Sequence, residues 1–252
     1  MADIIIRSFW TNDITKETIE DFRYVVNSVF GPFCTKEHFQ LKYINNIYGS
    51  SVLILAYSND MPVGACSLWR NDLEGEEAYL AADACVLPEY QGKGIYSAML
   101  KARTDIAAQR NHPLIYTFPN TNSFPRLIKK KWQVRILRKK IFFPGISNKN
   151  DIGIVDKQYA LWWLKQCEEI CHIKIFGKYY LVKTINKKGV GRILGLVDKE
   201  TAMNFPKSKS PLWVLYCESE KVTFYNERLT ATPIAYINGN GTHIPFWKMD
   251  SL

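Results

Sequence analysis

The chain has 252 residues, enough for one large domain or two small ones, and 47% of them are hydrophobic, enough for a packed core. No apolar run reaches the about 18 residues of a membrane-spanning helix, and the first residues lack the apolar stretch of a signal peptide, so we expect neither. The six cysteines lack framework spacing, which predicts reduced thiols, a cytoplasmic location and no metal site. The net charge of +9 suits an anionic partner such as a nucleotide.

Strand and helix patterns alternate over the first part of the chain. Thr15 is a suitable N-cap, and apolar residues then recur at helical spacing as far as Phe30. Asn59 and Asp60 form a turn between two apolar runs, which predicts a hairpin. The predicted helices cover residues 15–30, 35–48, 94–110 and 120–131. The predicted strands cover residues 2–9, 50–58, 62–70, 78–87, 114–118 and 134–143.

The pattern changes near Pro144, where a loop of glycine, asparagine and serine begins. Asp156 can cap a helix that reaches Ile170, and short strand-like runs follow it. These runs are residues 179–185, 192–197, 212–217, 222–225 and 233–237. We therefore expect two domains, residues 1–143 and a helix-plus-sheet extension over residues 144–252.

One short stretch, "VLPEYQGKGIYSAML", joins a predicted strand to a predicted helix through a turn with two glycines. Glycines before a helix let a ligand approach the main chain, and the helix N-terminus attracts phosphate. Two known phosphate-binding patterns do not fit this stretch. A P-loop needs glycine at Leu87, and a dinucleotide-binding fingerprint needs glycine at Ser97.

The run Gln91-Gly92-Lys93-Gly94-Ile95-Tyr96 instead resembles the coenzyme A pyrophosphate loop of the GNAT acyltransferase superfamily, Gln/Arg-x-x-Gly-x-Gly/Ala. The resemblance covers residues 51–132, with Asn120 at the usual asparagine. It implies an α/β (α+β) fold with a mixed central sheet flanked by helices, to which this chain adds a C-terminal α+β extension. It also implies direct acetyl transfer from acetyl-CoA to an amine. The implied CoA-binding residues are Cys85, Val86, Leu87, Gln91, Gly92, Lys93, Gly94, Ile95, Tyr96 and Asn120.

Three places depart from the family pattern, and one of them is Lys131-Trp132, where Gly-Phe is usual after the later helix. Tyr96 stands where a small residue is usual, and Leu127 stands where many members carry a tyrosine that protonates the departing thiolate. A thiol with a pKa of about 8.5 is mostly protonated near neutral pH, so water can supply that proton.

Asp83 is the candidate for proton acceptor, because it lies in an otherwise apolar strand just before the loop. Burial there is expected to raise its pKa towards a useful value. The alternative is that Asp83 only bonds nearby backbone groups. Glu76 and Glu77 are interpreted as solvated, and His38 and His112 as surface or loop residues.

Three readings of the function stay open. Residues 42–56, 83–100 and 118–124 look similar to GNAT members associated with polysaccharide assembly, which implies an amino-sugar acceptor, often carried on a nucleotide. The alternatives are a protein or peptide amine, and a catalytically silent CoA-binding module. Eight basic residues in 126–140 lack interleaved aromatics, so a nucleic-acid partner is not expected. The aromatic-rich extension is expected to bind the acceptor or to form a homodimer.

Overall fold

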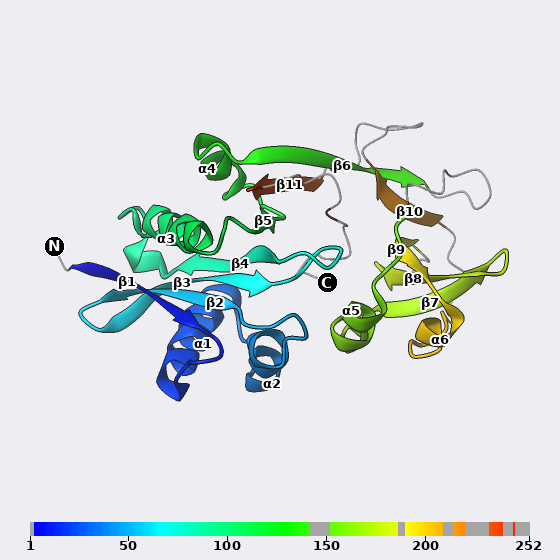
Figure 1. Ribbon diagram of the computed structural model, residues 1–252, viewed down its shortest axis with the longest axis horizontal. Coiled ribbons are helices and arrows are strands. Elements are labelled where there is room, and N and C mark those ends of the chain that lie inside the picture. Colours follow the sequence, from blue (N-terminus) through cyan, green and yellow to red (C-terminus); the bar gives the residue numbers. More distant parts are fainter. Residues whose placement is uncertain are drawn as a thin grey trace. The chain divides into compact units, whose positions relative to one another are not determined.

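The computed structural model describes residues 3–141, 152–185, 190–208, 214–219, 232–238 and 244, and it divides into two compact units (Figure 1). The first unit comprises Met1–Thr117 and Tyr236–His243, and the second comprises Phe118–Ala235 and Ile244–Leu252. The expected mixed fold class, with sheet and flanking helices, is confirmed. The domain boundary at residue 143 stays a prediction.

The first unit contains a sheet in which consecutive strands pair as neighbours. Its strands are β1 (Ile4–Trp10), β2 (Val52–Ser58), β3 (Met61–Arg70), β4 (Ala78–Val86) and β5 (Leu114–Thr117). The first three pairings are antiparallel, and β4 pairs with β5 in parallel. Every residue of β2 is buried, as expected for a strand covered on both faces. The strands predicted for this unit are confirmed.

Helices cover both faces of this sheet. Figure 1 shows α1 (Lys16–Phe30) and α2 (Lys36–Phe39) on one face and α3 (Ile95–Gln109) on the other. The Thr15 hydroxyl accepts a hydrogen bond from the Thr18 N–H at 3.2 Å, which confirms the predicted cap. The helix predicted for residues 35–48 is wrong in type and extent, because the α-helix continues after Phe39 as a π-helix, η1 (Gln40–Ile44).

The second unit pairs its strands in the order β6-β10-β9-β8-β7. The helix predicted to reach Ile170 is wrong, because α5 ends at Trp162, a 3-10 turn follows, and Ile170 begins a strand. The predicted strand at residues 222–225 lies outside the described residues. The strands of this unit are β6 (Gln133–Ile141), β7 (Ile170–Ile175), β8 (Lys178–Thr184), β9 (Val190–Val197) and β10 (Val214–Ser219). The residues of β11 (Thr232–Ile237) are divided between the two units. The helices are α4 (Phe124–Lys129), α5 (Lys157–Trp162) and α6 (Lys199–Ala202).

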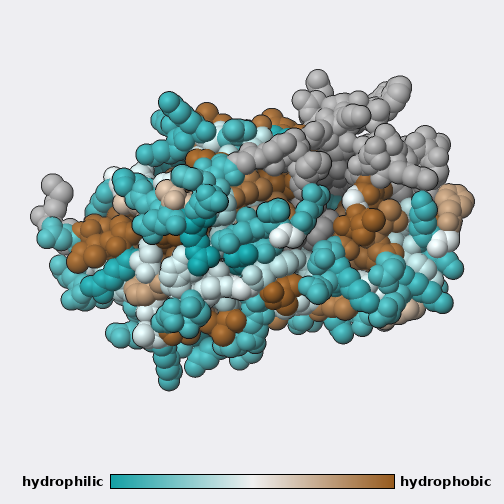
Figure 2. Space-filling model, viewed as in Figure 1, coloured by the Kyte–Doolittle hydropathy of each residue, from teal (hydrophilic) through white to brown (hydrophobic). Residues whose placement is uncertain are grey.

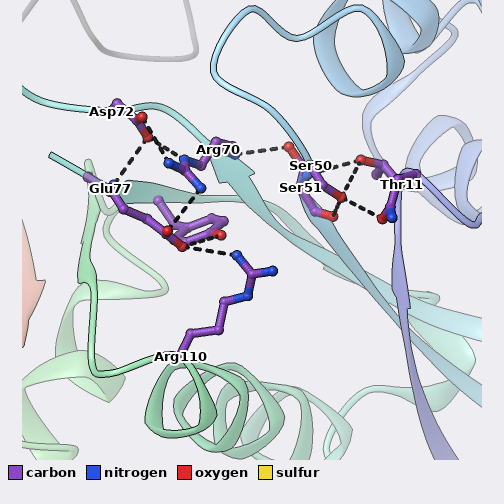
Figure 3. Close-up of polar contacts among 10 residues, drawn as sticks. Thr11, Ser50, Ser51, Arg70, Asp72, Glu77 and Arg110 are labelled. Carbon is purple, nitrogen blue, oxygen red and sulfur yellow. Dashed lines mark hydrogen bonds and ion pairs between the residues drawn. The ribbon is translucent and has the colours of Figure 1, made fainter. Parts of the chain in front are cut away.

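A network of ion pairs holds the connection between β3 and β4 (Figure 3). Arg70 binds the Asp72 carboxylate through two nitrogens, and its Nη1 lies 3.1 Å from Glu77 Oε2. Arg110, just after α3, reaches Glu77 Oε1 at 3.3 Å. Partial burial alone would raise the pKa of Glu77, but the Tyr79 hydroxyl and the two arginines lower it. Glu77 was expected to be solvated; it is instead a half-buried link between β4 and the end of α3.

The visible surface is mostly hydrophilic and carries several apolar areas (Figure 2). Such apolar side chains on a surface are ordinary. None of the helices among the described residues is both long and apolar enough to cross a membrane.

Phe22 shows how α1 is held on the sheet. Its side chain is 0% exposed, and its ring centroid lies 6.0 Å from that of Phe39 and 5.6 Å from that of Tyr43. Phe22→Ala should lower the free energy of unfolding by about 3–5 kcal/mol, because it leaves a cavity beside the rings of Phe39 and Tyr43. Tyr24→Ala, on the same helix and 51% exposed, is the control and should change stability by about 0.5 kcal/mol or less. Equal losses in urea unfolding would contradict this packing.

Candidate active site

The glycine turn between β4 and α3 has the backbone that the sequence predicts. Gly92 and Gly94 have φ angles of 76° and 81°, in the left-handed region that favours glycine, and Gly94 is the N-cap of α3. A Cβ atom at either position would meet nothing within 4 Å. Glycine is therefore needed at these positions for the left-handed backbone conformation and not to avoid a clash. Both residues are exposed.

The start of α3 presents main-chain donors beside this turn. The first hydrogen bond of the helix runs from the Ala98 N–H to the Gly94 carbonyl at 3.1 Å. Helix geometry leaves the N–H groups of the first turn without partners inside the helix, and the helix dipole adds positive potential there. Lys93 is exposed in the same turn, with its Nζ 4.6 Å from the centroid of the Tyr90 ring. The turn thus gathers the groups that bind a phosphate.

The end of β4 has an open backbone edge. The parallel pairing with β5 involves only Ala78, Tyr79 and Leu80 of β4. At the other end, the Leu87 N–H donates to the Val63 carbonyl at 2.9 Å, so Leu87 faces β3. Alternation along a strand then turns the N–H and C=O of Val86 to the opposite edge. The Gln91 side chain is consistent with this direction of the Val86 carbonyl, because the Gln91 Nε2 donates a hydrogen bond to it at 3.1 Å.

Cys85 lies on the same stretch and is buried. Burial, and the nearby Asp83 carboxylate, raise the pKa of its thiol far above the usual range. Since the thiolate is the reactive form, Cys85 is not activated as a nucleophile.

Asp83 lies at a β-bulge. Ser67 pairs with Ala82 and Ala65 pairs with Cys85, so β4 contains one more residue than β3 between these pairs. The φ angle of Asp83 is 50°, which is uncommon for a residue other than glycine.

The Asp83 carboxylate is buried in an ion pair with Lys42. Their Oδ2 and Nζ atoms are 2.9 Å apart, and the side chains are 8% and 1% exposed. The Tyr43 hydroxyl also donates to Oδ2, and Ser67 Oγ lies 3.5 Å from it. Lys42 and Tyr43 both come from η1, and π-helical turns occur frequently at functional sites.

The expected upward shift of the Asp83 pKa is wrong. Burial alone would raise the pKa, but the Lys42 ammonium and the hydrogen bonds from Tyr43 and Lys42 hold it below its usual range. His38, interpreted as a surface residue, is half-buried one helical turn before Lys42. Burial first and Lys42 second lower the pKa of His38. No sequence motif marks Lys42, although its position three residues after the buried Phe39 indicates the inner face of the helix.

Ile95, which is buried, and Tyr96, which is half-buried, begin α3 in the first unit, whereas Asn120 and Leu127 lie in the second unit. The Asn120 side-chain oxygen accepts hydrogen bonds from the N–H groups of Asn122 at 3.0 Å and Ser123 at 2.9 Å. Asn120 thus stabilises the turn before α4. Leu127 is 2% exposed and offers no proton. Among the described residues, no group of three or more metal-ligating side chains could hold an ion.

The ion pair gives a prediction on stability. Lys42→Met leaves a buried, unpaired carboxylate and should cost about 3–5 kcal/mol near neutral pH. The cost should shrink as the pH falls, for two reasons. In the variant, protonation removes the unpaired charge, and below a pH of about 4 the wild type also begins to lose the contribution of its depressed Asp83 pKa. Adding Asp83→Asn to Lys42→Met should recover part of the loss. Urea titrations at several pH values measure this, and a loss independent of both pH and the second change would contradict it.

Comparisons with known proteins agree with this geometry. Residues 13–125 match the model of the acetyltransferase (GNAT) family. No curated protein sequence matches the chain. The fold is similar to that of a GCN5-related N-acetyltransferase from Kribbella flavida, with 12% identity, a TM-score of 0.54, and 92% of this chain and 71% of that chain covered.

Eis1 from Mycobacterium abscessus is also similar, with 10% identity, a TM-score of 0.52, and 85% and 65% of the two chains covered. At these identities the likeness shows the fold alone. The match at 92% coverage necessarily includes part of residues 144–252. The family match covers the glycine turn, the open edge of β4 and the Lys42–Asp83 pair, so this part of the chain is similar to the GNAT acetyltransferase family.

Proposed function

We propose that the chain transfers an acetyl group from acetyl-CoA to a primary amine, with the CoA diphosphate at residues 91–96. The observation that carries this proposal is the glycine turn, which joins the open edge of β4 to the start of α3. Main-chain N–H groups there suit a diphosphate, and a free strand edge suits the extended pantetheine arm, which can pair like an added strand.

The reaction needs few side chains. The amine nitrogen attacks the thioester carbonyl, a C–N bond forms and the C–S bond breaks. The nitrogen then loses a proton to water, and the thiolate takes a proton. The N–H of Val86, on the open edge, stabilises the negative charge that develops on the carbonyl oxygen. Because Leu127 supplies no proton, water protonates the thiolate. An alkylamine with a pKa of about 10.4 arrives protonated and must first lose a proton. We propose Asp83 as the acceptor of that proton.

We propose the amine of a nucleotide-linked amino sugar as the acceptor. The net charge of +9 supports an anionic acceptor. The aromatic residues after residue 144 support stacking on a sugar or a base. Among the described ones, Trp162, Tyr179 and Tyr236 are partly exposed, whereas Trp163 and Tyr180 are only 7% exposed and belong to the core. Trp213, Tyr225, Trp247 and the side chain of Tyr216 lie outside the described residues.

The acceptor class can be measured by thiol release from acetyl-CoA with three sets of amines: nucleotide amino sugars, peptides and small amines. We expect turnover with the nucleotide amino sugars. Turnover only with peptides would replace this acceptor and keep acetyl transfer. Tight acetyl-CoA binding without thiol release for any amine would instead support a CoA-binding module.

The glycine turn gives a second prediction. Gly94→Asp should abolish acetyl-CoA binding, because it places a negative charge where the diphosphate would bind. Gly75→Asp is a matched control, because Gly75 has a φ angle of 84°, is exposed, and also has open space around its Cβ position. Both variants therefore carry the same backbone strain, and the control should keep the wild-type Kd. Calorimetry with acetyl-CoA measures this, and equal Kd values for the two variants would refute the loop assignment.

A further inference from the structure

We propose that the exposed side of α4 docks the protein on an anionic lipid surface. Two apolar and four basic residues at and just after this helix are exposed, and together they are called the α4 surface: Pro125, Ile128, Arg126, Lys129, Lys130 and Lys131. Acetyl transfer does not require this contact, so the two proposals are independent.

The positive charge of the chain is concentrated in one segment. Residues 106–150 contain ten lysines and arginines and no aspartate or glutamate. The rest of the chain carries 23 basic and 24 acidic residues, so the net charge of +9 arises entirely in this segment. Helix α4 lies at the centre of the segment and leads directly into β6 (Figure 1). A local excess of one sign of charge attracts a partner of the opposite sign.

The three lysines of the α4 surface are available to such a partner. All three are exposed, and within the part of the chain that the structure describes, Lys129, Lys130 and Lys131 take part in no ion pair. Arg135 on β6 differs, because its Nη2 donates to the Ile244 carbonyl at 2.9 Å. Arg135 is therefore used inside the protein, whereas the lysines face solvent.

Helix α4 ends in a Schellman motif that contains one of these lysines. The Lys131 N–H donates to the Ile128 carbonyl at 2.9 Å, and the Trp132 N–H donates to the Leu127 carbonyl at 3.1 Å. The motif requires a left-handed residue, usually glycine, yet Lys131 occupies the position with a φ angle of 61°. A lysine in this conformation costs free energy that glycine would avoid. The chain thus keeps a charge where glycine would be more stable, which indicates a task for that charge.

Apolar side chains lie beside the cations of α4. Ile128 is 46% exposed, and Pro125, three residues before it, is also exposed. At about 100° for each residue these two are neighbours on the helix, and Lys129, Arg126 and Lys130 continue the exposed arc. An arc that changes from apolar to basic suits a lipid surface, where apolar groups enter the acyl boundary and cations bind the headgroup phosphates.

A nucleic acid fits this surface less well. Single strands stack on exposed aromatic rings, but the two aromatic residues at the ends of α4 are Phe124, which is half-buried, and Trp132, which is 6% exposed. On a duplex the lysines would bind phosphates and Ile128 would gain no apolar contact. The aliphatic side chain among the cations therefore favours lipid.

The test is co-sedimentation of the full chain with vesicles, made either of phosphatidylglycerol and phosphatidylcholine or of phosphatidylcholine alone. We expect the wild type to bind only the anionic vesicles, and to bind them more weakly as the salt concentration rises. Replacing Lys129, Lys130 and Lys131 together by glutamine should lower the affinity about 100-fold, since each lysine near an anionic surface contributes about fivefold. A wild type that does not bind anionic vesicles would refute the proposal.

A second triple variant is the matched control. Lys36→Gln, Lys101→Gln and Lys157→Gln remove the same charge from lysines outside α4, whose side chains are 69%, 74% and 47% exposed. This variant should keep most of the affinity for the vesicles. Equal losses in the two triple variants would mean that only the net charge matters, and the α4 surface would then have no special role.

Two single variants test the apolar contact and the strained lysine. Ile128→Ser leaves the charge unchanged and should weaken vesicle binding, whereas Ile47→Ser, at a 42% exposed position outside α4, should not. Lys131→Gly should raise Tm and lower vesicle affinity about fivefold, because it removes the strain and the charge together. Unchanged vesicle binding in Ile128→Ser would exclude lipid as the partner, and unchanged binding in a more stable Lys131→Gly would contradict the task of that charge.

Binding of acetyl-CoA separates this proposal from the proposed function. The triple variant of the α4 lysines should keep the wild-type Kd for acetyl-CoA in calorimetry, because these lysines lie outside the glycine turn. A parallel loss of acetyl-CoA affinity would assign the lysines to the cofactor and refute docking. A wild type that binds anionic vesicles but not acetyl-CoA would refute only the proposed function.

Discussion

A lysine ammonium whose side chain is 1% exposed can stay charged inside a protein only beside an opposite charge. Asp83 supplies that charge, and it does so from the one residue of β4 where the strand register changes. The pair therefore connects the helical segment η1 to the centre of the sheet. The residues that follow lead from Cys85 through the glycine turn to the start of α3. The pair thus lies in the segment of β4 that precedes the candidate active site.

Local signals predict the glycine turn and the strands beside it. The turn needs only Gly92 and Gly94 between an apolar run and a helical pattern, and a polar Asp83 in an apolar strand already indicates a special position. The bulge has no such signal, because alanines lie on both sides of Asp83 and no alternation marks the extra residue. The partner of Asp83 is also hidden, since Lys42 lies 41 residues away and the contact exists only in the folded chain.

The wrongly predicted helix end near Ile170 has a related cause. Tyr159, Trp163, Cys167 and Ile170 share a helical spacing, yet residues 170–175 also alternate as a strand does. Strand pairing decides between the two patterns, because residues 170–175 form β7 and pair with β8, with Ile170 opposite Lys183. Tertiary context likewise determines that α2 passes into a π-helix, which brings Lys42 and Tyr43 together onto Asp83.

The C-terminal end of helix α3 is bound to two strands of the sheet, and this has a consequence for its other end, at the glycine turn. Arg110 contacts Glu77 at the start of β4 and lies 4.1 Å from the centroid of the Trp10 ring at the end of β1. The 15 residues between the two ends make a rod of about 22 Å, at about 1.5 Å for each residue. Because each residue also turns the helix by about 100°, one residue gained or lost within α3 would change the angle between the first-turn N–H groups and the Arg110 end by about 100°. The number of residues in α3 therefore sets both the distance and the rotation between these two ends.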